Sequence, residues 1–222
     1  MRFFVALLVA ILPFKIKRYF YRSFFGFEIH ATARIGISIL MPRHLTMYAG
    51  SRIGHLNFIK NLSEVSLGES SSIGNLNWIT GFPVGNKSQY FADQPDRNPI
   101  LFLGNYSAIT NRHLIDCTDS VRIGHHATVA GFRSQILTHS ISIAESRQRS
   151  AAIEIGDYTF IGTGAIMLPG SCLPSFSILG AGSVLNKKYA DQYYLYAGNP
   201  ARPIREVDRA AAYFNRALGF VV

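Results

Sequence analysis

The chain has 222 residues and a formal net charge of +9, from 22 Lys and Arg against 13 Asp and Glu. Apolar residues make up 48% of it, which excludes a globally disordered chain, and its two cysteines imply no disulfide framework. The positive charge attracts polyanions such as nucleic acid, an acidic membrane surface or a phosphorylated cofactor, and composition does not choose among them.

The first element is an apolar N-terminal segment. Residues 3–14 are apolar except for Pro13, and basic residues interleaved with aromatic ones follow as far as Phe25. This run is too short to span a bilayer, which needs about 20 residues, and no A-x-A-like cleavage site follows it. We therefore predict a membrane-proximal segment over residues 1–28 that lies on the surface through residues 3–25. Packing against the domain or a partner subunit, and a cleaved signal peptide, remain alternatives.

A period of six residues dominates the rest of the sequence. From Ile155 it reads IGDYTF, IGTGAI, MLPGSC, LPSFSI, LGAGSV, with an aliphatic residue or Met first, often Gly second and a small residue fifth. The same phrase occurs upstream from Ile123, Leu103 and Leu67, and more weakly from Ile35 and Ile53. Five consecutive hexads exceed what chance produces.

This period fits neither an amphipathic helix nor alternating strands. It is typical of a coil with three short flat faces, whose first residue points inward and whose small fifth residue clears the corner. Stacked coils bury a continuous ladder of aliphatic side chains. We predict an all-β fold, a left-handed parallel β-helix over residues 29–204, with an ordinary β-sandwich as the alternative.

Three stretches depart from the period. Residues 81–99 and residues 143–152 read as excursion loops thrown out between coils, and long excursions in compact repeat domains tend to be functional. In residues 205–222 the apolar side chains fall at helical spacing, which predicts a C-terminal amphipathic helix.

From Ile155 to the phrase GNPARPIRE, the chain resembles the hexapeptide-repeat acetyltransferases, which use acetyl-coenzyme A. The phrase AGFRSQILTHSI (residues 130–141) resembles the polysaccharide O-acetyltransferase branch in particular. The resemblance covers residues 101–206, whereas residues 30–80 match only in repeat style. It implies a homotrimer with active sites between subunits, acetyl-coenzyme A as co-substrate and a histidine as general base.

Acyl transfer to a hydroxyl needs a base near neutral pH and donors for the oxyanion. His139, in LTHS, matches the family's catalytic histidine, and the alternative is a histidine that caps a turn. Its orienting partner is not evident, since the nearest acidic residue, Glu145, lies in the predicted loop. His113 corresponds only approximately to a family asparagine that helps to define the site, so it is a second catalytic candidate, with a surface corner histidine as the alternative.

The remaining histidines indicate no further chemistry. His125 and His126 occupy corner positions of a hexad and read as solvated. The seven histidines show no H-x-x-x-H spacing and the cysteines no C-x-x-C spacing, so we expect no metal site.

The resemblance also implies a set of coenzyme-binding residues. Small residues let the backbone approach the pantetheine arm, an aromatic side chain lies beside the arm, and polar or basic side chains meet the adenine and phosphates. The positions that match are Phe160, Gly162, Thr163, Gly180, Ala181, Asn186, Lys187, Arg202 and Arg205. For Lys187 and Arg205 a solvated basic edge is the alternative.

The excursion at residues 81–99 has no counterpart in the small sugar acetyltransferases that the chain resembles. Its aromatic residues suit stacking on sugar rings and its charged residues suit hydroxyl groups, which makes it a candidate for acceptor binding. These residues are Phe82, Tyr90, Phe91, Asp93, Asp96 and Arg97.

The sequence thus predicts an O-acetyltransferase that acts on a sugar hydroxyl of a bacterial surface polysaccharide (capsule, exopolysaccharide or lipopolysaccharide) or its precursor. An N-acetyltransferase on an amino sugar and a non-catalytic β-helix scaffold are the alternatives. We expect a cytoplasmic protein, peripheral at the inner face of the membrane, that binds a glycan acceptor and no nucleic acid.

Overall fold

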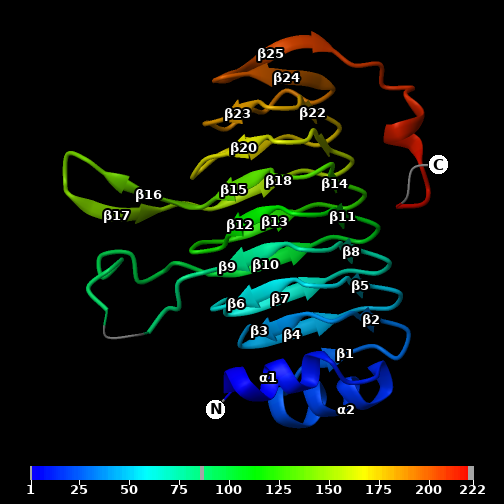
Figure 1. The fold of residues 1–222 in the computed structure, drawn as a ribbon. Coiled ribbons are helices and arrows are strands. Elements are labelled where there is room, and N and C mark those ends of the chain that lie inside the picture. Colours follow the sequence, from blue (N-terminus) through cyan, green and yellow to red (C-terminus); the bar gives the residue numbers. More distant parts are fainter. Residues whose placement is uncertain (1, 86–87, 220–222) are drawn as a thin grey trace.

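The computed structural model describes residues 2–85 and 88–219. Met1, residues 86–87 and residues 220–222, which belong to the predicted N-terminal segment, first excursion and C-terminal helix, lie outside the described residues. The chain winds into stacked coils whose strands form three parallel sheets around one core (Figure 1). This arrangement confirms the predicted left-handed β-helix.

Each coil contributes one short strand to each sheet. Sheet A contains β1 (Glu28–Ile29), β4 (His44–Met47), β7 (Glu64–Leu67), β10 (Ile100–Leu103), β13 (Val121–Ile123), β18 (Ile153–Ile155) and β21 (Cys172–Leu173). Sheet B contains β2 (Arg34–Ile35), β5 (Arg52–Ile53), β8 (Ser72–Ile73), β11 (Ala108–Ile109), β14 (Thr128–Val129), β19 (Phe160–Ile161), β22 (Ile178–Leu179), β24 (Tyr194–Gly198) and β25 (Ala201–Glu206). Sheet C contains β3 (Ile39–Met41), β6 (Phe58–Lys60), β9 (Trp78–Thr80), β12 (Leu114–Asp116), β15 (Gln135–Leu137), β20 (Ile166–Met167) and β23 (Val184–Leu185).

The register shows why the period is six. Glu154 pairs with Cys172, 18 residues further on, so one coil is three hexads. The upstream coils, where the sequence pattern is weaker, are equally regular: Glu28 pairs with Thr46, again 18 residues away. The aliphatic residue that opens each hexad points inward, and these side chains form one continuous buried cluster. Burial of this ladder is what holds neighbouring coils together.

Close stacking of coils explains the glycine at the second hexad position. A Cβ atom added to Gly74 would lie 2.3 Å from the carbonyl oxygen of Thr110 in the next coil. That distance is far inside van der Waals contact, so only glycine fits without shifting the backbone. The glycines seen in the sequence therefore serve stacking between coils.

Two excursions leave the same edge of the prism, where sheet C turns into sheet A, and lie side by side (Figure 1). The first runs from Gly81 to Pro99 with no strand among its described residues. The second, expected as a loop over residues 143–152, is instead an antiparallel hairpin that begins earlier, formed by β16 (His139–Ser142) and β17 (Arg147–Ser150). Alternation is weak in its sequence, so the loop interpretation missed the pairing.

The N-terminal segment forms two helices, α1 (Arg2–Ala10) and α2 (Phe14–Phe25), that cover the open end of the first coil (Figure 1). Ala6 and Tyr21 are fully buried against the coil. Lys17 is also buried, and its Nζ donates to the carbonyl oxygen of Gly36 at 2.7 Å. The packing against the domain that the sequence left open is therefore present. Within the described residues, no helix is long and apolar enough to cross a membrane.

The C-terminal tail is not the helix that its spacing predicted. Residues 201–206 form β25, which pairs antiparallel with β24, and only Ala212–Asn215 form a short 3-10 helix. The tail's apolar side chains serve tertiary packing instead: the ring of Phe214 packs edge-on against Phe176 and Tyr193. Packing and the strand pairing outweigh helical propensity here.

The rings beneath this tail belong to an aromatic ladder at the edge between sheets A and B. Five rings stack from coil to coil with centroids 4.5–5.3 Å apart, namely Tyr106, His126, Tyr158, Phe176 and Tyr193. His126 is thus half-buried in a stack, not solvated as expected. Neighbouring His125 is exposed, but its Nδ1 accepts from the Asn105 amide at 3.0 Å.

Candidate active site

A histidine–aspartate pair lies where the second excursion leaves the β-helix. His139 Nδ1 is 2.7 Å from Asp116 Oδ2. Asp116 ends β12, and His139 begins β16 two residues after the end of β15, the strand that stacks on β12. The stacking of consecutive coils therefore creates this pair.

The Asp116 carboxylate is held by several further donors. Oδ1 accepts from the amide and hydroxyl of Thr118 at 3.1 and 2.6 Å. Oδ2 accepts from the amide and hydroxyl of Thr138 at 3.0 and 2.9 Å and from the His139 amide at 3.1 Å. With both oxygens fixed, the carboxylate holds the imidazole in one orientation and one tautomer, with the Nδ1 proton facing Asp116.

The two groups shift each other's pKa. The hydrogen bond from His139 to Asp116 and their Coulomb attraction raise the pKa of the imidazole, although partial burial opposes this. Burial raises the pKa of the Asp116 carboxyl, but hydrogen bonds from His139, Thr118 and Thr138 outweigh it, so the net shift is downward. The His139 side chain is 43% exposed, and its Nε2 forms no hydrogen bond within the described residues. Nε2 is thus free to take a proton from a bound hydroxyl.

The first excursion closes against this pair. The Phe91 ring packs edge-on to the His139 ring at 6.2 Å, and the guanidinium of Arg97 lies 4.3 Å from the Phe91 centroid. Arg97 is 8% exposed and donates to the carbonyl oxygens of Thr118 at 2.8 Å and Phe82 at 3.1 Å. Phe91 and Arg97, expected to contact sugar, are therefore committed to holding the excursion beside the catalytic pair.

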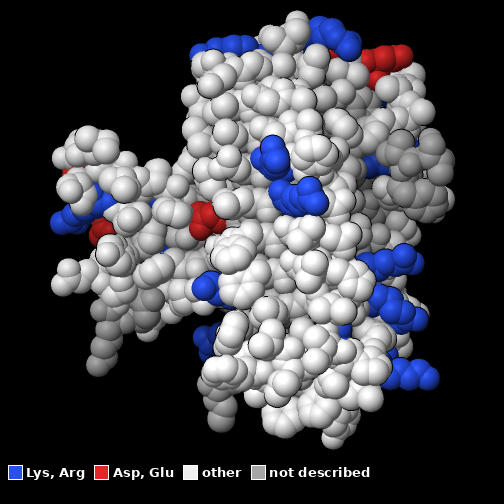
Figure 2. Space-filling view, viewed as in Figure 1, with Lys and Arg blue, Asp and Glu red and all other residues white. Residues whose placement is uncertain are grey.

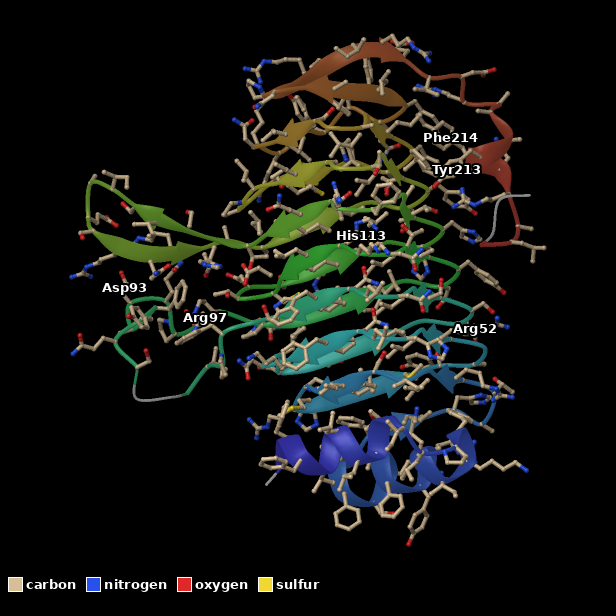
Figure 3. The ribbon with its side chains drawn as sticks, in the orientation of Figure 1. Arg52, Asp93, Arg97, His113, Tyr213 and Phe214 are labelled. Carbon is tan, nitrogen blue, oxygen red and sulfur yellow. The ribbon has the colours of Figure 1, made fainter. Side chains whose placement is uncertain are left out.

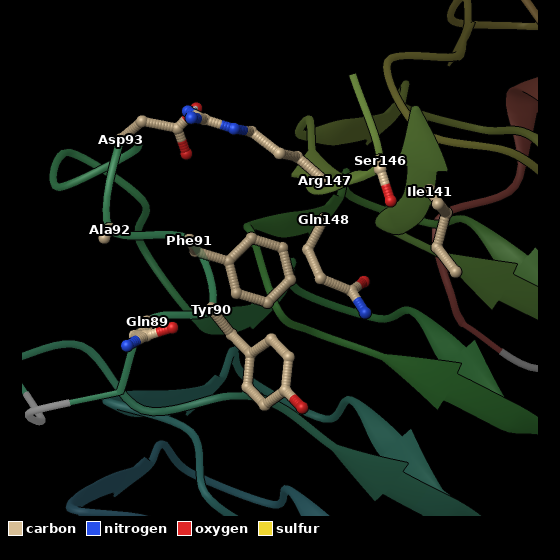
Figure 4. Close-up of a pocket in the computed structure, with 9 residues that line it drawn as sticks. All are labelled: Gln89, Tyr90, Phe91, Ala92, Asp93, Ile141, Ser146, Arg147 and Gln148. Carbon is tan, nitrogen blue, oxygen red and sulfur yellow. Dashed lines mark hydrogen bonds and ion pairs between the residues drawn. The ribbon is translucent and has the colours of Figure 1, made fainter. Parts of the chain in front are cut away.

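A cavity of about 700 Å³ lies between the two excursions (Figure 4). Tyr90 and Phe91 from the first excursion face Gln148 and Ile141 from the hairpin. Tyr90 is 60% exposed, so of the predicted sugar-contacting aromatic residues it is the one with an open face. The cavity adjoins His139 through Phe91.

His113 occupies a different setting, inside the prism and apart from Asp93 and Arg97 of the excursion (Figure 3). It is 2% exposed, its Nδ1 accepts from the Ser134 amide at 3.2 Å, and its Nε2 pairs with the Thr110 hydroxyl at 2.9 Å. Burial lowers its pKa to about 4. A neutral ring with both nitrogens engaged has no group left to offer a substrate bound to this chain.

The side chain of His113 continues a buried polar ladder through the coils. The Asn77 amide donates to Asn57 Oδ1 at 2.9 Å, and the His113 amide donates to Asn77 Oδ1 at 2.9 Å. The Ser134 amide then donates to His113, so each rung satisfies the backbone of the next coil. This geometry is that of a structural histidine, and it gives no support to the catalytic interpretation.

The predicted coenzyme residues are spread over separate parts of the prism. Gly162, Thr163, Gly180 and Ala181 lie at the edge where sheet B turns into sheet C, and Ala181 is exposed. Asn186 and Lys187 are exposed at the edge that also carries the excursions. Arg202 and Arg205 are exposed on β25. Half-buried Phe160 lies on sheet B, where its ring packs edge-on against Tyr213 at 5.8 Å.

One chain therefore does not gather these residues around His139. The backbone of Gly162 also has a structural task, because a Cβ there would lie 2.5 Å from the Ala181 nitrogen. Thr163 Oγ1 donates to the carbonyl oxygen of Phe132 at 2.8 Å, which joins two coils. Among the described residues, no cluster of three or more His, Cys, Asp or Glu is arranged to hold a metal ion.

Asp116 is the residue that sequence reasoning missed. The search for a partner of His139 followed proximity along the chain and reached Glu145, which in the structure pairs with Arg149 at 2.8 Å. The usable signal was the coil length. Residues one coil before Thr138 and His139 lie directly beneath them, and Asp116 is the acidic residue there.

Comparison with known proteins agrees with this class of fold. No family model matches the chain. A Schizosaccharomyces pombe protein described as a putative acetyltransferase is 37% identical over 68 residues, 28% of this chain and 32% of that protein. The chain thus spans about a third of the length of this curated relative.

Solved structures match over most of the chain. The polysialic acid O-acetyltransferase OatWY superposes with a TM-score of 0.52 at 16% identity, over 81% of this chain and 84% of that one. The polysialic acid-specific acetyltransferase NeuO gives 0.50 at 14% identity, over 81% and 80%. A hexapeptide transferase family protein from Anaplasma phagocytophilum gives 0.50 at 16% identity, over 82% and 87%. The chain therefore shares the fold of hexapeptide-repeat acetyltransferases.

Proposed function

We propose that the protein is an acetyl-coenzyme A-dependent O-acetyltransferase that acylates a sugar hydroxyl. The observation that carries this is the His139–Asp116 pair, 2.7 Å apart, beside a cavity of about 700 Å³. A carboxylate-oriented imidazole with a free, exposed Nε2 is the arrangement that general-base catalysis of acyl transfer requires. The shared fold and the polysialic acid acetyltransferases within it are consistent with this chemistry.

The reaction needs only one proton shuttle. His139 Nε2 takes the proton of the acceptor hydroxyl as its oxygen attacks the thioester carbonyl, and Asp116 stabilises the imidazolium. When the carbon–sulfur bond breaks, the proton passes from Nε2 to the thiolate sulfur, so the products are the sugar ester and the free thiol. Exposed Asn186, Lys187, Arg202 and Arg205 suit the phosphates of the coenzyme, with the backbone at Thr163 and Ala181 along its arm.

The decisive experiment measures thiol release from acetyl-coenzyme A with a glycan panel, alongside calorimetry of coenzyme binding. We expect His139→Ala to lose about 10²-fold or more in turnover while it still binds coenzyme. His44→Ala, at an exposed histidine of sheet A, should retain turnover. No turnover and no coenzyme binding by the wild type would favour a scaffold. An alkali-stable amide product would favour transfer to an amino sugar.

We further propose that three copies assemble, so that each site lies between two chains. Exposed apolar residues gather on sheet C and on its edge with sheet B, among them Leu56 (63% exposed), Trp78 (52%) and Phe132 (54%). An exposed apolar surface of this kind marks a protein interface. Assembly also gives the separated coenzyme residues a common ligand, because an edge of one chain meets a face of the next.

The acceptor we propose is a bacterial surface polysaccharide or its lipid-linked precursor, reached from the membrane surface. Aromatic rings project from the helices at the foot of the molecule (Figure 3), with Phe4 68%, Tyr19 66% and Phe24 67% exposed. No Asp or Glu precedes Glu28. Figure 2 shows this end largely free of charged atoms, with Lys and Arg along one flank. An apolar face with adjoining cations suits an anionic bilayer.

The geometry sets the height of the site above such a surface. His139 follows the fifth strand of sheet C, and parallel strands are spaced by about 4.8 Å, so the site stands roughly 20 Å above the first coil. A sugar directly joined to a membrane lipid would lie below it. The proposed acceptor is therefore a glycan long enough to reach the mid-height of the prism.

A further inference from the structure

The cavity between the two excursions has walls of two kinds. One is apolar: Tyr90 and Ile141 are 60% and 59% exposed and present an open ring face and an alkyl side chain. The other is polar, with the side-chain amides of Gln89 and Gln148. Its volume of about 700 Å³ lies within the range of small-molecule sites, about 300–1,000 Å³.

Gln148 has unused hydrogen-bonding capacity. Its Oε1 is buried and has no hydrogen-bond partner among the described residues, although its side chain lines the cavity (Figure 4). Buried polar atoms are normally paired, and an unpaired one at a cavity wall points to a missing donor. A hydroxyl group supplies such a donor once the amide turns about its last bond.

The charges at the rim of the cavity cancel. The Asp93 carboxylate pairs with both Arg147 and Arg149, and Arg149 also donates to Glu145 at 2.8 Å. The hydrogen bond from Arg149 holds the pKa of Asp93 below its usual value, so the carboxylate stays charged. Two arginines face two carboxylates, which leaves no free cation for an acidic ligand.

A pyranose without a carboxylate matches these walls. Its C–H face suits the open face of Tyr90, since the centre of an aromatic ring is electron-rich, and its hydroxyls suit the two amides. A carboxylate on the sugar would have to displace Asp93 or Glu145 from the arginines.

We propose that this cavity is the acceptor subsite and that it holds a neutral pyranose residue of the glycan. This inference rests on the proposed function for the identity of the ligand as acceptor. Phe91 and Arg97 fix the wall next to His139, and Tyr90 and Gln148 contact the sugar.

The test measures binding of matched sugar pairs to the full-length protein without acetyl-coenzyme A, so that no turnover occurs. The probes are the methyl β-glycosides of glucose and galactose and the corresponding uronides, which differ only by a carboxylate. Saturation-transfer NMR gives their dissociation constants. We expect the glycosides to bind about tenfold more tightly than the uronides, and Tyr90→Ala to weaken the glycosides about tenfold. Tyr90→Phe should retain binding, because it keeps the ring.

Two further variants test the polar features. Gln148→Ala should weaken the glycosides, and Asp93→Asn should strengthen the uronides by releasing Arg147 and Arg149. Tyr48→Ala, at an exposed tyrosine on another edge, is the matched control and should change nothing. Tighter binding of uronides to the wild type would overturn the proposal, as would no binding of any glycoside or an unchanged Tyr90→Ala variant with native thermal stability.

Coenzyme binding and thiol release, measured on the same variants, separate this proposal from the function on which it rests. Tyr90→Ala should leave the affinity for acetyl-coenzyme A unchanged. If the glycosides bind but His139→Ala releases thiol at the wild-type rate, the catalytic proposal fails and the sugar site stands. If His139→Ala is inactive and the uronides bind better, the enzyme stands and the neutral-sugar proposal fails.

Discussion

His139 Nδ1 and Asp116 Oδ2 are 2.7 Å apart, although 23 residues separate them in the chain. Asp116 pairs in register with Leu137, so the residues that follow Leu137 come to lie above the residues that follow Asp116. One step of the β-helix thus places a base on its orienting carboxylate. Neither residue alone signals catalysis, since an exposed histidine and a buried aspartate are both common.

Asp116→Asn should move the pH profile of turnover. The base works in its neutral form, so the raised pKa of His139 places the acidic limb above about 6.5, the ordinary histidine value. Without the carboxylate the imidazolium loses its partner, the pKa of His139 falls, and the limb moves to lower pH. The plateau should fall about 10²-fold as the ring loses its orientation.

Turnover of the variant measured from pH 5 to pH 9 in one buffer series checks this. Asp208→Asn makes the same change of charge at an exposed, distant residue and should leave the profile in place. An unmoved acidic limb in Asp116→Asn would show that His139 is not the titrating base.

His113→Asn should remove a pH dependence of stability without removing activity. The folded-state pKa of about 4 lies below the ordinary 6.5, so the unfolded chain binds more protons between these values. The His113 contribution is complete above pH 6.5 and is lost as the pH falls to about 4, at most about 3 kcal/mol in all.

Asparagine is the matched replacement because Asn57 and Asn77 occupy the two preceding rungs of the same ladder. Urea unfolding of both proteins at pH 7 and pH 4.5 measures the difference. Equal pH dependence in the two would contradict the assignment, and a large loss of turnover at pH 7 would restore a catalytic role for His113.

The sequence predicted most of the fold because the hexad repeat is itself the coil. Each aliphatic residue points inward for the same geometric reason, so one period describes the whole core. The site was only half predictable. A motif identified His139, but its partner lies one coil away, and distance along the chain is a poor guide to contact in a solenoid.

Two errors came from local patterns that have a tertiary explanation. His113 reads as an isolated polar residue until it is aligned with Asn57 and Asn77, which take the same fifth place in IGHLNF and IGNLNW. The tail residues fall at helical spacing, but Phe214 packs on rings contributed by separate coils. Helical periodicity of a short apolar set does not distinguish an amphipathic helix from a strap over a ladder.

Trp78→Glu should dissociate the proposed trimer. Trp78 is 52% exposed in the middle of sheet C, stacked on Phe58 at 4.7 Å and paired in register with Leu114. A carboxylate there would be buried unpaired at the interface, which typically costs several kcal/mol. We expect a monomer by light scattering and loss of turnover, because the coenzyme residues then no longer share a ligand.

Tyr48→Glu places the same charge on another exposed aromatic position and should leave the assembly intact. A Trp78→Glu variant that stays trimeric would remove this face from the interface. A monomer with full turnover would show that one chain builds a complete site.

Phe4→Ser with Phe24→Ser should abolish binding to anionic vesicles. Both rings are about two-thirds exposed on the helices that close the first coil, whereas Ala6 and Tyr21 on the same helices are buried. The double variant therefore removes surface contacts without touching the helix core. Sedimentation with equimolar phosphatidylcholine and phosphatidylglycerol vesicles should show at least about a tenfold loss of affinity.

Lys15→Glu with Arg22→Glu tests the electrostatic half of the same contact. Each cation near an anionic surface contributes about 1 kcal/mol, so binding should weaken further in salt and should be poor for the wild type on pure phosphatidylcholine. Ile204→Ser, 58% exposed at the opposite end on β25, is the control and should bind normally. If the phenylalanine variant instead changes the oligomeric state while vesicle binding persists, the foot packs on another copy of the chain. In that case the roughly 20 Å height of His139 would place no length requirement on the acceptor.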